Sequence, residues 1–169
     1  MTASRRGRKR HFGSCTGAIL ALGFALTAAG YPPASRAATT ERVVVDRHTG
    51  LAIYGVDPVA YFTDRKRIVG RAEFEYRHAG AIWRFDNEGN RAAFMSDPEV
   101  YMPLFGGYDP VGIGRGVSTA GFPDLWAVFD ERLYLFYTAE ARTAFIANPT
   151  DVIASASARW GTVKSELPE

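Results

Sequence analysis

Two stretches of this chain repeat one another at a constant offset of 51 residues, and this repeat constrains the fold more than any other feature. Each copy reads as a strand, a tight turn, a second strand and a helix, with the strands expected at 73–77, 82–85, 125–129 and 133–136. Five aligned positions are identical: Phe85/Phe136, Arg91/Arg142, Ala93/Ala144, Phe94/Phe145 and Pro98/Pro149. The chain therefore predicts an α+β fold, with a small antiparallel sheet built from two duplicated β-hairpin–helix units and helices packed on one face.

The local residue pattern agrees with this prediction. Asn87 and Thr138 are suitable N-caps for the helix of each copy. Asp97-Pro98 and Asn148-Pro149 place a capping residue before a first-turn proline, and so start a further helix. Residues two apart on a strand share one face. We therefore expect one shared aromatic core, formed by Trp83, Phe85, Phe94, Tyr134, Phe136 and Phe145.

The first 37 residues have the pattern of a secretory signal peptide. Residues 4–11 are strongly basic, residues 16–30 carry no charge, and small residues follow. The apolar run is shorter than the ~20 residues that span a bilayer, which favours cleavage over anchoring. Arg5-Arg6 is followed by Gly7, Arg8 and Lys9, where a twin-arginine signal usually has a large apolar residue, so general secretion is favoured. We expect a periplasmic or secreted protein with no membrane span after cleavage.

Removal of the signal peptide limits the chemistry of the mature chain. The single cysteine, Cys15, is lost, which excludes thiolate metal sites and cysteine nucleophiles. Residues 38–169 hold 14 basic and 18 acidic side chains, a balance that argues against a nucleic-acid partner. The glycine-rich run 112–116 lacks the strand, the lysine and the spacing of a phosphate-binding loop. No cofactor is expected.

Several short motifs occur in an order that resembles the YHS-domain family, specifically its small exported bacterial type. They are Gly55-Val56-Asp57-Pro58-Val59-Ala60-Tyr61-Phe62, Asn90-Arg91-Ala92-Ala93-Phe94, Asp97-Pro98-Glu99-Val100-Tyr101, Gly106-Gly107-Tyr108 and Leu133-Tyr134-Leu135. The resemblance covers residues 51–161, so 38–50 is expected to be a flexible segment and 162–169 a C-terminal tail. It implies metal handling, since some members accompany copper-transporting pumps, although stand-alone exported members have no assigned function.

One departure from the family pattern affects that implication. The family commonly has cysteine after Gly-Gly-Tyr, and this chain has Asp109. A carboxylate is a hard ligand and Cu(I) prefers soft ones, so tight Cu(I) binding is not expected.

The candidate site residues lie around the two Asp-Pro pairs. A carboxylate there could hold a hard cation or act in acid–base chemistry, or it could simply cap a turn or helix. The expected ligand-binding set is Asp109, Tyr108, Asp57, Tyr61, Gly106 and Gly107. Asp109 and His78 are weaker metal candidates, because no further ligand is adjacent in sequence.

The favoured function is an exported, non-catalytic binding module for a small ligand or a protein partner. Two alternatives remain: a periplasmic metal-handling protein for a hard cation or in association with copper, and a structural or interaction domain. A hydrolase or isomerase using Asp57 and Asp109 has less support, because no catalytic constellation is recognised.

Overall fold

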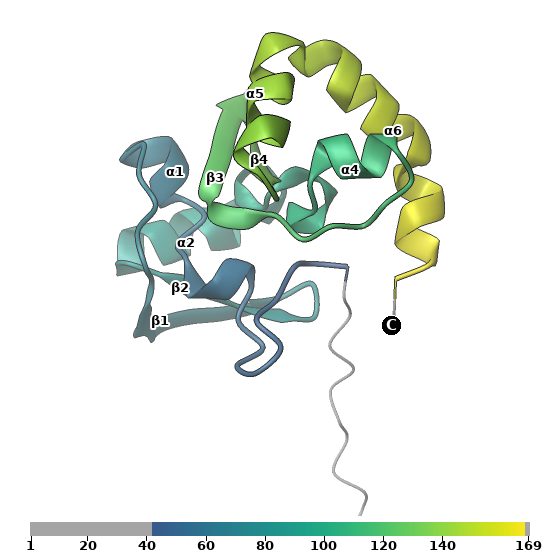
Figure 1. The fold of residues 1–169 in the computed structure, drawn as a ribbon. Helices are drawn as coiled ribbons and strands as arrows, with labels where there is room; N and C mark the ends of the chain where they lie inside the picture. The colour runs from purple at the N-terminus through teal and green to yellow at the C-terminus, as the bar shows by residue number, and fades with distance from the viewer. Residues whose placement is uncertain (1–41, 168–169) are drawn as a thin grey trace, which may run out of the picture. The chain divides into compact units, whose positions relative to one another are not determined.

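A computed structural model describes residues 42–167 (Figure 1). The expected signal peptide, residues 1–37, lies outside the described residues. No helix within 42–167 is both long and apolar enough to cross a membrane. The elements in chain order are η1 (Ile53–Gly55), α1 (Ala60–Thr63), β1 (Arg71–His78), β2 (Ala81–Phe85), α2 (Glu88–Ser96), α3 (Pro98–Tyr101), η2 (Leu104–Gly107), α4 (Pro110–Gly114), β3 (Phe122–Phe129), β4 (Arg132–Phe136), α5 (Ala139–Ala147) and α6 (Pro149–Ser165).

The α+β class is confirmed, and both hairpins are antiparallel. Their turns use left-handed residues, Ala79-Gly80 and Asp130-Glu131, as two-residue hairpin turns require. The strands differ from the expectation in forming two separate two-stranded sheets. The outer edge of β2 is already bonded to the chain at 50–52, through Ala52 N–H to Ile82 O at 2.8 Å. That pairing leaves the second hairpin no strand edge to join there.

The helices begin where the sequence predicts. The Asn87 side chain accepts from the Asn90 amide at 2.9 Å, and Thr138 accepts from the Ala141 amide at 3.1 Å. Pro98 and Pro149 stand in the first turns of α3 and α6, although neither preceding side chain makes a capping bond. The α2 helix lies on the first hairpin and α5 on the second, so each helix covers the sheet of its own copy (Figure 1).

All six expected aromatic core residues are buried, but they form two clusters and not one shared core. Trp83, Phe85 and Phe94 belong to the first cluster, and Tyr134, Phe136 and Phe145 to the second. Strand β4 is buried on both faces, because Leu133 and Leu135 point into the first cluster while Tyr134 and Phe136 point into the second. This strand therefore separates the two clusters and contributes to both.

The repeat extends further toward the N-terminus than the offset of 51 indicates. Asp57 N–H donates to Ile68 O at 2.9 Å, and Asp109 N–H donates to Thr119 O at 2.8 Å. Gly70 N–H donates to Gly55 O, and Gly121 N–H donates to Gly107 O. The two Asp-Pro turns are thus equivalent parts of two copies, which we define as the first repeat, residues 53–101, and the second repeat, residues 105–165.

Both ends of the described chain are more firmly attached than expected. Residues 38–50 were expected to be flexible, yet Val43 and Val44 are buried, and Val44 N–H donates to Gly106 O at 2.8 Å. Apolar side chains there gain more by burial in the two clusters than by remaining in water. At the other end α6 runs past residue 161, with Val163 and Leu167 buried, so part of the expected tail belongs to the domain.

Candidate functional site

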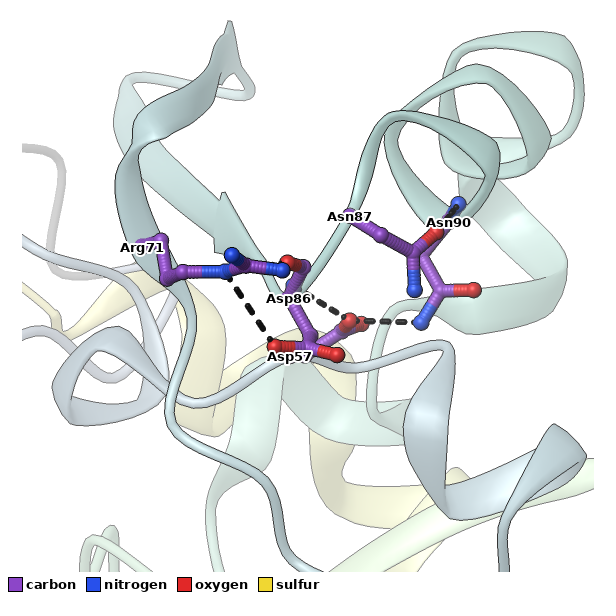
Figure 2. A network of polar contacts seen from close by, with 5 residues as sticks. All are labelled: Asp57, Arg71, Asp86, Asn87 and Asn90. Atoms are coloured by element: carbon purple, nitrogen blue, oxygen red, sulfur yellow. Dashed lines mark hydrogen bonds and ion pairs between the residues drawn. The ribbon is translucent and has the colours of Figure 1, made fainter.

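The Asp57 side chain is fully buried and is saturated by donors from its own repeat (Figure 2). One carboxylate oxygen accepts from the amides of Val59, at 2.8 Å, and Ala60, at 3.3 Å. The other accepts from the Asp86 amide at 2.8 Å and from the Asn90 side-chain amide at 2.6 Å. The carboxylate therefore joins the start of α1, the end of β2 and the first turn of α2.

Asp109 repeats this arrangement with fewer partners. It is 4% exposed; one oxygen accepts from the Val111 amide at 2.8 Å and the other from the Tyr137 amide at 3.0 Å. The position equivalent to Asn90 is Ala141, which has no side-chain donor to offer. Asp57 and Asp109 share no hydrogen-bond partner, since each ties together backbone of its own repeat.

The two tyrosines of the expected ligand-binding set lie in different surroundings. Tyr61 is fully buried and its hydroxyl donates to Pro123 O at 2.8 Å, linking the first repeat to β3. Burial raises the pKa of this hydroxyl far above its ordinary value. Tyr108 is 7% exposed and packs near Trp160, with ring centroids 6.2 Å apart. The structure thus gives Tyr61 and Tyr108 different partners.

Gly106 does permit a close backbone approach, and the approaching group is the chain itself. Its φ is +64°, and an added Cβ would collide with Arg42 O. Gly107 has a φ of +88°, and a Cβ added there would lie 3.5 Å from Val44 and 3.4 Å from Pro103. These glycines therefore seat the N-terminal segment against η2.

The histidine named as a metal candidate takes part in aromatic contacts. The His78 ring lies edge-on to Phe94, with centroids 5.9 Å apart, and stacks on Tyr76 at 6.2 Å. Within residues 42–167, no three His, Cys, Asp or Glu side chains are grouped as a metal site would need.

A cavity of about 470 Å³ lies elsewhere in the structure. We call it the inter-repeat cavity, because both repeats line it. Its apolar walls include Trp83, Phe105 and Trp160, and its charged residues are Arg42, Arg132, Lys164 and Glu99. The remaining lining residues are Val43, Ala79, Gly80, Met102, Pro103, Leu104 and Gly106.

A second cavity, of about 620 Å³, is the one that Tyr108 borders. Its walls are largely polar, with Asp46, Arg47, His48 and Glu166 among them. Small-molecule sites are usually apolar with a few placed polar groups, which favours the inter-repeat cavity. Asp57, Tyr61 and Asp109 line neither of these cavities.

Comparisons with known proteins add no assignment. No family model matches the chain, no curated protein matches it, and no solved structure matches it.

Of the expected set, only Gly106 borders the inter-repeat cavity. Arg132, Trp160 and Lys164 were missed, because none of them belongs to a motif and Arg132 lies 28 residues before Trp160 in the sequence. One signal was available for the structural role of the aspartates: Asp57-Pro58-Val59 and Asp109-Pro110-Val111 match at an offset of 52. This shifted match indicates two equivalent turns and not two halves of one site.

Proposed function

We propose that this chain is an exported YHS-like domain that binds a small ligand and carries out no catalysis. The observation that supports the proposal best is the inter-repeat cavity, with its aromatic walls and its few charged groups. Its volume of about 470 Å³ lies within the range of small-molecule sites, roughly 300–1,000 Å³.

The buried aspartates support a binding role over an acid–base role. A general acid or base must reach its substrate within hydrogen-bond distance. Asp57 and Asp109 instead accept from amides at the start of α1 and α4, and neither lines the cavity. Export of the mature chain remains part of the proposal and depends on the signal-like sequence of residues 1–37.

Native mass spectrometry of the protein purified from the compartment that receives it tests this proposal. We expect a non-covalent adduct on the wild type that disappears when Leu104→Trp fills the cavity. Leu125→Trp is the matched control, since Leu125 is also partly buried in the second cluster but does not line the cavity. An adduct that Leu104→Trp retains, or a wild type without any adduct, would contradict the proposed function.

A further inference from the structure

We propose that the inter-repeat cavity selects a small organic anion that has a flat apolar body, and this inference rests on the proposed binding function. The shared chemistry is an anionic head group, carboxylate or phosphate, on a planar ring system. The residues that carry the inference are Arg132 and Lys164 for the head group, and Trp160 and Phe105 for the ring.

The charge of the cavity is the first support. Three cationic side chains line it, Arg42, Arg132 and Lys164, against a single carboxylate, Glu99. This excess stands out because residues 38–169 as a whole carry more acidic than basic side chains. A cavity with low-dielectric walls and one predominant sign of charge concentrates ions of the opposite sign.

The state of Arg132 is the second support. Its Nε atom is buried and has no hydrogen-bond partner in the described chain, although a buried polar group is ordinarily paired. No carboxylate of residues 42–167 forms an ion pair with Arg132 or Lys164. A guanidinium binds planar anions through two parallel N–H bonds, so an Arg132 side chain that lines the cavity without an ion-pair partner among residues 42–167 suits a carboxylate or phosphate.

The aromatic wall is the third support, and it explains why the ligand should be flat. The Phe105 and Trp160 rings meet edge to face, with centroids 5.8 Å apart and planes at 73°. Both residues line the cavity, as does Trp83. Aromatic side chains favour stacked or edge-on contact with another ring, which a planar ligand provides.

The test uses 2-naphthoate as the probe, with 2-naphthyl phosphate as a second anion and 2-naphthamide as a neutral control. Binding to the purified protein is followed by the indole N–H signals in an NMR titration. Trp160 lines the cavity, whereas Trp126 packs on Tyr61 and lines none of the described cavities. We expect an anion to shift the Trp160 signal and leave that of Trp126 in place, with binding at least about tenfold tighter than for the amide.

Two substitutions test the head-group residues. Arg132→Gln and Lys164→Gln should each weaken anion binding about tenfold or more. The exposed residues Arg77 and Lys66 line no described cavity, so Arg77→Gln and Lys66→Gln are matched controls and should change nothing. Whichever of 2-naphthoate and 2-naphthyl phosphate the protein binds more tightly identifies the head group that the cavity selects.

The outcomes separate this inference from the proposed function. Equal binding of 2-naphthamide and 2-naphthoate at Trp160 would overturn anion selection and leave the cavity as a binding site. No shift of Trp160 up to the solubility limit of the probes would also overturn the inference, and the native mass-spectrometric adduct would then decide the proposed function by itself. The comparison of anion with amide uses only the wild type, so it stands even if a substituted protein fails to fold.

Discussion

The fully buried carboxylate of Asp57 allows a quantitative test of the structural role that we assign to the Asp-Pro turns. Asp57→Asn preserves shape and replaces one oxygen by an amide nitrogen. If the remaining oxygen still accepts a hydrogen bond from the Val59 amide, the new nitrogen faces two donors, the Asp86 amide and the Asn90 side chain. A hydrogen bond to a charged group contributes about 1.5–3 kcal/mol, so losing two should reduce the free energy of unfolding by about 3–6 kcal/mol.

Asp109 and Asp97 complete a graded series. Asp109→Asn leaves one donor, the Tyr137 amide, without its acceptor, and should cost about 1.5–3 kcal/mol. Asp97 also precedes a proline, but it is exposed and its side chain makes no capping bond, so Asp97→Asn should cost less than about 0.5 kcal/mol. Urea unfolding followed by circular dichroism gives all three values. A cost for Asp57→Asn no greater than that for Asp97→Asn would refute the structural role.

Three further predictions concern other parts of the chain. Phe94→Ala and Phe145→Ala should each lower the free energy of unfolding by about 3–5 kcal/mol, because each side chain fills the core of its repeat; urea unfolding would contradict this with a loss below about 1 kcal/mol. Tyr61→Phe should cost about 1–3 kcal/mol in the same assay, because it leaves the buried Pro123 carbonyl without a donor. Because burial raises the pKa of Tyr61, the unfolded chain releases the hydroxyl proton at a lower pH than the folded chain does. The free energy of unfolding should therefore fall as the pH rises above about 10, and fall less steeply in Tyr61→Phe. Equal pH dependence in the two proteins would disprove the contribution of Tyr61. The exported protein should begin between Tyr31 and Thr40 on N-terminal sequencing, and an intact N-terminus in the membrane fraction would exclude cleavage.

The sequence predicted the two hairpins and the helices that follow them, because their signals are local. The Asn87 and Thr138 caps, the first-turn prolines and the alternation of Trp83 with Phe85 each involve neighbouring residues, and all appear in the structure. The expectation of one sheet and one aromatic core failed for a non-local reason. Only the fold shows that the chain at 50–52 takes the edge of β2, and that β4 is buried on both faces.

The candidate site was harder to predict, because similar residue types serve different roles. An Asp-Pro pair in a glycine-rich loop is compatible with a ligand site and with a capped turn. Amide donors decide between these roles. Some are local, but one donor to each carboxylate comes from a residue 29 positions further along the chain for Asp57 and 28 positions for Asp109. The inter-repeat cavity depends in turn on how the two repeats meet, which no local pattern encodes.

The residues proposed to select the ligand lie where the second repeat departs from the first. Arg132 stands at the start of β4, and its equivalent in β2 is Ala81. Helices α3 and α6 both begin at an equivalent proline, but α3 ends at Tyr101 whereas α6 continues to Ser165. Trp160 and Lys164 belong to those additional turns, which lie beside the cavity. The features that the repeats share, namely the Asp-Pro turn, the hairpin and the buried phenylalanines, maintain the fold. Because selection of an anion depends on the unshared features, we infer that the first repeat alone could not form this site.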